Sequence, residues 1–364
     1  MANTQALGQL FVFGFDGFVL PNKAKELLIT HNAGGVILFK RNIDNLRQLV
    51  FLNQKLLTLK TEQAPLISVD EEGGRVSRLR EICTQIPSAR CMAEAAKDDP
   101  TLVYRLAAML GRELVSLGFH LDFAPVADVD TNPENPVIGD RSFSNRVDEV
   151  SHWVREWISG MQGAGVATCA KHFPGHGDTS QDSHLTLPSV DHDMARLEAL
   201  ELQPFKAAIS AQVASIMTAH IVVKKVEAKL PATLSVFFNR TVLREQLHFN
   251  GLLFSDDLDM KAITTNFALE ETLLRGLHAG IDCFLICQDT DKCEAAIAFV
   301  HKLVDTHAID PVLVTGALER MAHFKQRYIG AVCPPSIEVA MRTVRSKPHL
   351  ALAALTPHNE ALNP

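Results

Sequence analysis

The sequence predicts an α/β protein that folds as a single-domain (β/α)8 barrel of the TIM type. Short apolar or β-branched segments alternate with segments of helical periodicity along its 364 residues. Alternation of strands and helices is typical of a parallel sheet that helices cover. About eight strand candidates favour a closed barrel. An open doubly wound sheet is the structural alternative.

The predicted strands are the most apolar stretches of the chain. Near-continuous apolar runs suit strands that are buried on both faces, as in a parallel sheet. These runs cover residues 11–15, 35–39, 66–70, 121–129, 167–173, 215–223, 251–257 and 282–287. No G-x-G-x-x-G motif follows the first run, which argues against a dinucleotide-binding fold.

Four segments between these strands predict helices. Residues 101–119 place their apolar side chains on one stripe and end at a glycine stop signal, and residues 147–165 do the same. Residues 199–213 and 239–251 also predict helices, each of them ahead of a strand.

We expect residues 1–335 to form the barrel domain, with residues 336–364 as a C-terminal helix and tail packed on it. No Ser/Gly-rich linker and no internal repeat marks a second domain. Barrels of this class often reach such a length as one domain.

Composition and charge exclude several functions. Hydrophobic residues make up 47% of the chain and charged residues 21%, which is ordinary for a globular protein. The formal net charge is −7 without a basic stripe, so we expect no nucleic-acid partner. No apolar run is long enough to span a bilayer, so we expect no membrane partner. No Lys or Arg precedes Lys23, so we expect no secretory signal and a cytoplasmic location.

The cysteines predict free thiols rather than disulfides. There are seven, an odd number, and no C-x-x-C pair occurs. We expect buried free thiols in a reducing compartment. A zinc site built from Cys283, Cys287 and Cys293 is an alternative, but their spacing fits no common zinc motif.

Polar residues follow the apolar runs of four predicted strands. Residues 70–75 read DEEGGR, Lys171 and His172 end the fifth run, His220 follows residues 215–219, and residues 256–257 are both Asp. In a barrel, the carboxyl ends of the strands converge on the face that carries the active site. At any one strand, the polar residues can be explained as the point where the strand meets solvent. Their recurrence at four strands favours a shared site.

Seven stretches, in order over most of the chain, resemble glycoside hydrolase family 3. The likeness is strongest to its single-domain β-N-acetylhexosaminidases, known as exo-β-N-acetylglucosaminidases of bacterial cell-wall recycling. The stretches are GGVILFKRN (34–42), VDEEGGRVSRL (69–79), DFAPVADV (122–129), IGDRSF (138–143), the KHFPGHG…DSH loop (171–184), MTAHI (217–221) and FSDDLDM (254–260). Glu71, where glutamine is expected, and Asp259 depart from the family pattern. They bear on subgroup rather than on activity.

This resemblance implies a retaining exo-β-N-acetylglucosaminidase that uses neither a cofactor nor a metal. Its substrate would be a small sugar, a terminal β-linked N-acetylglucosamine of a muropeptide or chitooligosaccharide. Asp256 matches the family nucleophile, which forms a covalent glycosyl-enzyme that water later cleaves. Asp257 is the rival. Strand alternation predicts that it points to the opposite face, away from the site.

The resemblance also implies a histidine as general acid/base, His184, with Asp182 as its partner. A histidine with an ordinary pKa of about 6.5 can donate and accept a proton near neutrality. A hydrogen bond from Asp182 could fix its tautomer and orientation. Pro174, Gly175 and Gly177 predict a loop ahead of this pair. We expect that loop to swing His184 over the bound sugar.

The remaining polar residues of the matched stretches look like sugar binders. Asp70 would accept hydrogen bonds from ring hydroxyls, and the donors around the same ring would be Arg78, Arg141, Lys171 and His172. A site that hydrogen-bonds specific hydroxyls discriminates strongly, because unfilled partners are costly. His176 and His220 are candidates for holding the loop or a strand in place.

Four other functions stay open at this point. A phosphorylase is one, because a histidine acid/base carries no negative charge and lets phosphate approach the glycosyl-enzyme. A metal-dependent barrel hydrolase could use His172, His176, His184 and Asp182 as ligands, although no H-E-x-x-H motif occurs. A β-glucosidase of the family usually has a second domain with a glutamate acid. A non-catalytic sugar-binding protein would not need an intact nucleophile and His–Asp pair.

Overall fold

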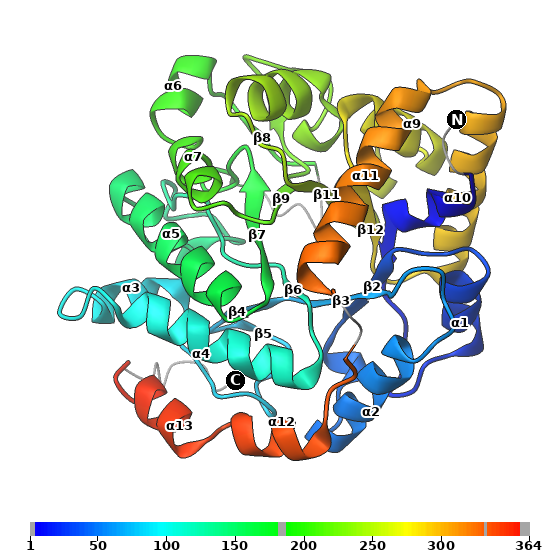
Figure 1. Cartoon of the computed structure of the whole chain (residues 1–364). Helices are drawn as coiled ribbons and strands as arrows, with labels where there is room; N and C mark the ends of the chain where they lie inside the picture. Colours follow the sequence, from blue (N-terminus) through cyan, green and yellow to red (C-terminus); the bar gives the residue numbers. More distant parts are fainter. Residues whose placement is uncertain (1–3, 181–186, 331–332, 357–364) are drawn as a thin grey trace.

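The centre of the computed structural model is a closed barrel of eight parallel strands (Figure 1). The structure describes residues 4–180, 187–330 and 333–356. The barrel order is β1 (Phe11–Phe13), β12 (Cys283–Ile286), β11 (Leu252–Asp257), β9 (Ser215–Thr218), β7 (Ala167–Phe173), β6 (Leu121–Asp122), β3 (Leu66–Val69) and β2 (Gly35–Leu38). Each predicted strand segment contributes one of these strands, so the predicted (β/α)8 barrel is confirmed.

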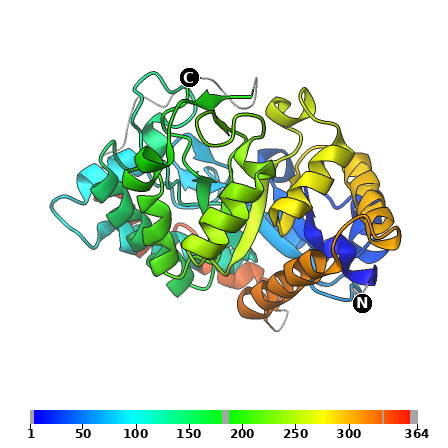
Figure 2. The same cartoon turned by 90° about the horizontal axis from the view of Figure 1, so that it is seen from above.

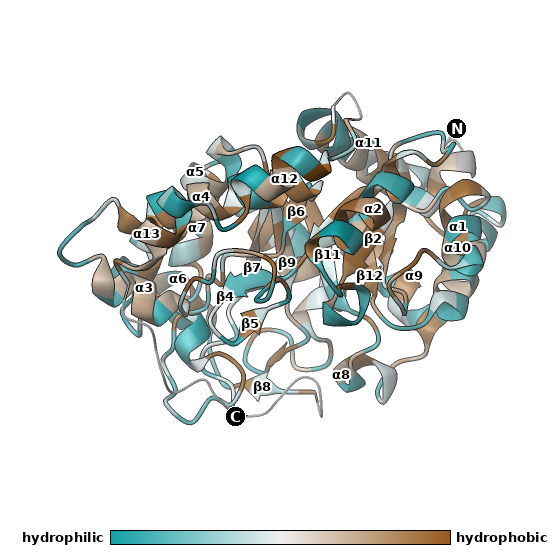
Figure 3. Cartoon of the chain, turned by 90° about the horizontal axis from the view of Figure 1, so that it is seen from below, coloured by the Kyte–Doolittle hydropathy of each residue, from teal (hydrophilic) through white to brown (hydrophobic). Residues whose placement is uncertain are grey.

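The strands separate two apolar cores. Because successive side chains point to opposite faces, Val12 and Ile37 fill the inside of the barrel, whereas Phe13 and Val36 face the helices. Figure 3 shows hydrophobic colour concentrated on the barrel strands. Burial on both faces explains why the strands are continuous apolar runs rather than alternating patterns.

An outer layer of helices covers the barrel. These helices are α1 (Asn22–Ile29), α2 (Leu46–Leu57), α4 (Leu102–Leu117), α5 (Val147–Gly163), α7 (Gln203–Ser210), the π-helical segment η5 (Phe237–Gln246), α9 (Leu269–Ala279) and α10 (Thr290–Asp305). The helices predicted over 101–119 and 147–165 are confirmed as α4 and α5. Helix α4 ends at Gly118, whose φ of 88° suits glycine.

The other elements are short and sit mostly in the loops. They are η1 (Thr4–Leu10), η2 (Lys40–Asn42), β4 (Glu71–Gly73), β5 (Val76–Ser77), α3 (Ala89–Ala95), η3 (Gly139–Arg141), β8 (Ser189–Val190), α6 (Met194–Ala199), β10 (Val222–Val223), η4 (Ala232–Leu234) and α8 (Lys261–Thr264). In place of the helix predicted over 199–213, the structure has α7, which covers only Gln203–Ser210. The preceding helix α6 ends at Ala199.

Two predicted strands are shorter than their apolar runs. The expectation of a strand over 121–129 is wrong beyond Asp122, because Pro125 has no N–H to continue the ladder. The run 215–223 also divides, since β9 ends at Thr218 and β10 leaves the barrel to pair with β8. These early strand ends leave polar loops at the carboxyl end of the barrel.

Helix α11 (Pro311–Tyr328) crosses the amino end of the barrel (Figure 1). Its Met321 and Phe324 belong to the core inside the barrel. The amino-terminal segment η1 packs against α10 and α11 on the same side (Figure 2). These elements close the amino end of the barrel.

The chain after Cys333 forms two short helices, α12 (Ile337–Thr343) and α13 (Lys347–Ala353), where one helix was expected. Both pack on α4. Oε1 of the buried Glu113 on α4 accepts hydrogen bonds from the Arg345 backbone N–H, at 3.0 Å, and from Nδ1 of His349, at 2.7 Å. Among the described residues, no helix is long and apolar enough to cross a membrane.

Candidate active site

A cavity of about 280 Å³ lies at the carboxyl end of the barrel strands. Its floor includes Ile37 and Leu285, which point inward from β2 and β12. Its polar lining comes from the strand ends and the loops after them: Asp70, Glu72, Arg75, Arg78, Arg141, Lys171, His172, His176, Asp256 and Asp257. The polar strand ends therefore meet in one site, with the exception of His220, which lies behind the wall.

One network of ion pairs joins the ends of β3 and β7. Nζ of Lys171 lies 2.8 Å from Oδ1 of Asp70 and 2.7 Å from Oε1 of Glu72. Arg141 donates two parallel hydrogen bonds of 2.8 Å to Glu72. Arg78 lies 3.8 Å from Asp70. Fork-shaped Arg–carboxylate pairs fix geometry strongly, so this network presents its charges in set positions.

These charges persist although the side chains are buried. Burial alone would lower the pKa of Lys171, but the charges of Asp70 and Glu72 raise it well above its usual range. Burial alone would raise the pKa of Glu72, but Arg141 and Lys171 hold it far below its usual range. Lys171 and Glu72 are therefore both ionised at neutral pH.

Asp256, near the end of β11, is a carboxylate at neutral pH. Burial opposes its ionisation, but the charges of His220 and His172 hold its pKa below the usual range. The backbone N–H of Asp257 also donates a 2.8 Å hydrogen bond to Oδ1 of Asp256. A nucleophilic carboxylate needs this kind of environment.

Asp257 also lines the cavity, so the expectation that it faces away is wrong. The pairing register of β11 with β12 is irregular between Phe254 and Asp257, which breaks the simple alternation. Oδ1 of Asp257 accepts hydrogen bonds from the backbone N–H groups of Asp259, at 3.0 Å, and Cys287, at 3.1 Å. Burial raises its pKa to about 6. Its carboxyl is thus already engaged by the backbone.

Asp182 and His184 lie outside the described residues. The described root of their loop contains His176, which is buried and lines the cavity. Nδ1 of His176 lies 2.8 Å from Oγ1 of Thr179. Burial, together with the charge of His172, lowers the pKa of His176 to about 4, so this imidazole is neutral at pH 7.

His220 is fully buried between two neighbouring strands. Its Nδ1 lies 2.8 Å from Oγ1 of Thr233, and its Nε2 lies 3.1 Å from the backbone oxygen of Asp257. It therefore touches the end of β11 from behind the cavity wall.

Two acidic residues with no role predicted from the sequence bind the polar groups of the site. Glu72 binds Arg141 and Lys171, as above. Asp128, in the loop after β6, lies 2.7 Å from Nδ1 of His172. An acidic residue inside an apolar run, as in PVADV, was the available signal, because a buried carboxylate requires a partner.

Glu71 is fixed in the β4–β5 hairpin and is not part of the cavity lining. Its carboxyl accepts hydrogen bonds from Oγ of Ser77 and from the backbone N–H groups of Arg78 and Leu79. Burial raises its pKa to about 7. The departure from glutamine therefore changes the hairpin rather than the cavity.

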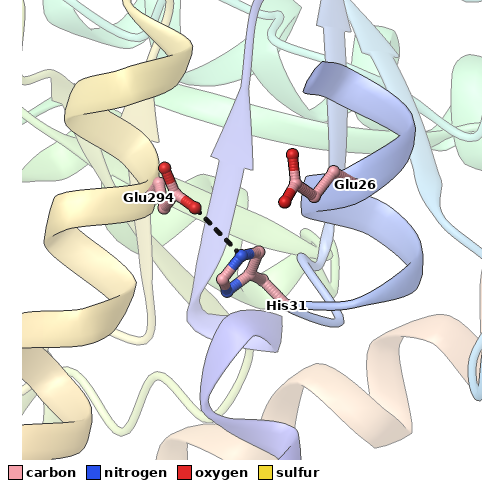
Figure 4. A group of neighbouring side chains, drawn as sticks. All are labelled: Glu26, His31 and Glu294. Atoms are coloured by element: carbon pink, nitrogen blue, oxygen red, sulfur yellow. Dashed lines mark ion pairs between the residues drawn. The ribbon is translucent and has the colours of Figure 1, made fainter. Parts of the chain in front are cut away.

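Within the described ranges, one group of side chains has metal-ligand geometry, and it lies outside the cavity. Glu26, His31 and Glu294 meet between α1 and α10 (Figure 4). Glu294 already forms ion pairs with Lys23, at 2.5 Å, and with His31, at 3.2 Å. The carboxylate of Glu294 is therefore already paired with the ammonium group of Lys23 rather than left for a metal ion.

The cysteines considered for zinc are buried free thiols, and they form no such group within the described part of the chain. Cys333 is exposed and Cys91 partly exposed, so the expectation of buried thiols is wrong for these two.

Fixed acids and cations around one cavity at the carboxyl end of a barrel indicate a site for a polar substrate. The chain belongs to glycosyl hydrolase family 3, because residues 4–324 match the family's N-terminal domain. A relative named "Beta-hexosaminidase" from Alkalilimnicola ehrlichii is 37% identical over 80% of this chain and 84% of its own length.

Two solved structures agree with this assignment. A glycoside hydrolase family 3 β-N-acetylglucosaminidase from Paenibacillus sp. superposes with a TM-score of 0.87 and 35% identity over 94% of this chain and 68% of its own. NagZ from Neisseria gonorrhoeae, in complex with N-trifluoroacetyl-D-glucosamine, gives a TM-score of 0.78 and 30% identity. That match covers 95% of this chain and 96% of NagZ.

Proposed function

We propose that this chain is a retaining exo-β-N-acetylglucosaminidase. It would remove terminal β-linked N-acetylglucosamine from a muropeptide or a chitooligosaccharide in the cytoplasm. The observation that carries the proposal is Asp256, a carboxylate kept ionised at the wall of a cavity in a family 3 barrel. The relatives named as β-hexosaminidases and β-N-acetylglucosaminidases support the choice of sugar.

Asp256 would attack the anomeric carbon and form a covalent glycosyl-enzyme, which water then hydrolyses with net retention. Electrostatic interactions with His220 and His172, and the backbone N–H of Asp257, hold the pKa of Asp256 below its usual range before attack. These groups are already in place, so little reorganisation is needed when the reaction begins.

The sugar ring would be held by Asp70, Arg78, Arg141, Lys171 and His172. Asp70 and Lys171 are 2.8 Å apart and both face the cavity, so one ring hydroxyl can donate to the carboxylate while it accepts from the ammonium. A substrate that lacks such a hydroxyl leaves both groups poorly paired, which is the basis for discrimination.

The leaving-group oxygen needs a proton, and we assign that role to His184 with Asp182 as its partner. Among the described cavity residues, Asp70 and Glu72 are held in ion pairs, and the carboxyl of Asp257 is bound by two backbone N–H groups. Asp257, which lines the cavity and whose pKa burial raises to about 6, is the rival acid. The assignment to His184 follows the resemblance to the family, and a histidine can donate and accept a proton near neutrality.

The substrate and reaction are tested by a panel of aryl glycosides, with and without phosphate. We expect turnover of the N-acetylglucosaminide, little turnover of the glucoside, and no acceleration by phosphate. Turnover that requires phosphate would make the enzyme a phosphorylase. Equal rates on glucoside and N-acetylglucosaminide would contradict the choice of sugar.

The acid is tested by His184→Ala. Substrates with poor leaving groups should lose far more activity than activated aryl glycosides, because good leaving groups need little protonation. Equal losses on both would count against His184 as the acid.

A further inference from the structure

Asp128 is a fully buried carboxylate whose two oxygens are both engaged by the chain after β7. Oδ2 lies 2.7 Å from Nδ1 of His172. Oδ1 accepts a 2.7 Å hydrogen bond from the backbone N–H of His176. The backbone N–H of His172 lies between the two oxygens, at 3.2 and 3.3 Å. One side chain therefore binds both ends of the segment 172–176.

The charge of Asp128 determines which nitrogen of His172 carries a proton. Burial opposes ionisation of this carboxyl, but the charge of His172 and its hydrogen bonds hold the pKa of Asp128 below the usual range. An ionised carboxylate only accepts hydrogen bonds, so Nδ1 of His172 must be the N–H donor. The Nε2 atom is then the nitrogen left for the cavity, which His172 lines.

This pairing also affects the nucleophile. An adjacent carboxylate holds a histidine ring in one orientation, as in the triads of hydrolases. His172 is one of the two charges that do most to hold Asp256 ionised. Loss of the carboxylate would leave the ring of His172 free to turn beside Asp256.

We propose that Asp128 is a positioning residue for the glycosidase reaction. It fixes the ring and tautomer of His172 against the sugar and Asp256. It also ties His176, at the root of the loop that leads to His184, to the same carboxylate. This inference rests on the proposed function. It adds a role for a residue that does not itself line the cavity.

The test is Asp128→Asn, with Asp130→Asn as a matched control. Asp130 lies two residues further on, pairs with Arg90 at 2.8 Å, and is also largely buried. We expect kcat/KM to fall about 10²-fold in Asp128→Asn, the cost typical of a misplaced site group, and to stay near wild type in the control. Equal losses in the two variants would indicate a merely structural role and overturn the proposal.

Substrates with different leaving groups distinguish a positioning role of Asp128 from a role of His172 as the proton donor. Because His172 acts on the sugar and the nucleophile, Asp128→Asn should lose the same factor on activated and poor leaving groups. A loss confined to poor leaving groups would make His172 the proton donor and contradict the positioning role. Asp256→Ala serves as the reference: if that variant keeps its activity, the proposed function fails rather than this inference.

NMR of the wild-type protein tests the proposal without relying on the folding of a variant. With ¹⁵N-labelled histidine, the ring nitrogens of His172 should show a protonated Nδ1 with a far-downfield proton that exchanges slowly. His172→Gln, which lacks the ring, assigns the signal. An unprotonated Nδ1 of His172 in the wild-type enzyme at neutral pH would overturn the proposal.

Discussion

The two ends of the barrel use buried ionisable groups for different purposes. At the carboxyl end, Asp70 and Lys171 form an ion pair that faces an open cavity. At the amino end, α11 covers the barrel and inserts Lys325, which is 6% exposed. Nζ of Lys325 donates hydrogen bonds to Oε1 of Gln9, at 2.6 Å, and to the backbone oxygen of Ala64, at 2.9 Å. The carboxyl-end charges face a cavity beside Asp256, whereas Lys325 is hydrogen-bonded to groups of the protein.

A second network at the amino end shows the same contrast. Asp282, at the start of β12, is fully buried and binds Arg244 at 2.6 Å and Arg320 at 2.8 Å. It also accepts a 2.8 Å hydrogen bond from the backbone N–H of Leu253. It thus ties β11, η5 and α11 together. Buried ion pairs alone do not identify an active site. A second cavity lies at the amino end and is lined by Arg320, so the candidate nucleophile Asp256 makes that distinction.

Asp256→Ala should have the largest effect on activity and almost none on stability. Because the nucleophile of the covalent step is lost, kcat should fall by at least about 10⁴-fold. The thermal unfolding midpoint should stay close to wild type, since Asp256 borders the open cavity. Asp257→Asn is the control, because an amide oxygen can still accept from Asp259 and Cys287. An active Asp256→Ala with an inactive Asp257→Asn would exchange the two roles.

Asp282→Asn should have the opposite signature at the other end of the barrel. Removal of one partner from a buried ion pair costs about 3–5 kcal/mol, because Arg244 and Arg320 lose their shared counter-charge. Urea denaturation should show that loss, while kcat/KM of the remaining folded enzyme stays near wild type. A large loss of kcat/KM at unchanged stability would break the distinction between the two ends.

Lys171→Met should reduce kcat/KM by about 10²-fold, which is smaller in free energy than either change above. Glu72 keeps its bidentate bond to Arg141, and Asp70 can take water from the cavity, so the cost in stability should be modest. Kinetics and urea denaturation of the same preparation test both statements. A stability loss as large as that of Asp282→Asn would show that Lys171 is chiefly structural.

Lys325→Met should have the smallest effect on activity, and an effect on stability that depends on pH. Burial lowers the pKa of Lys325 from 10.5 to about 7. Between these values the unfolded chain binds a proton that the folded chain does not, so stability from this group rises with pH across that window. The slope reaches about 1.36 kcal/mol per pH unit. The variant should lack this rise in the free energy of unfolding. An unchanged pH dependence would contradict a neutral buried lysine.

Much of the fold could be predicted because each barrel strand is a continuous apolar run, as in LISV before Asp70. The general position of the site also followed, since polar residues come directly after these runs. The partners could not be predicted, because the barrel joins residues far apart in sequence. Lys171 and Asp70 are separated by 101 positions, and Arg141 and Glu72 by 69.

Two further details depend on tertiary structure alone. The irregular register of β11 turns Asp257 toward the cavity, against the alternation expected of a strand. The role of Asp128 depends on the close approach of the loop after β6 to the end of β7, where Val126 pairs with Lys171. Neither the register shift nor this pairing has a local sequence signal.

The most direct test of the central claim is covalent trapping of the nucleophile. The enzyme is incubated with a fluorinated N-acetylglucosaminyl fluoride, whose glycosyl-enzyme hydrolyses slowly, and its peptides are then analysed by mass spectrometry. The proposed mechanism predicts a single N-acetylglucosamine-derived label on Asp256. A label on Asp257, or turnover to the inverted sugar with no labelled peptide, would contradict it.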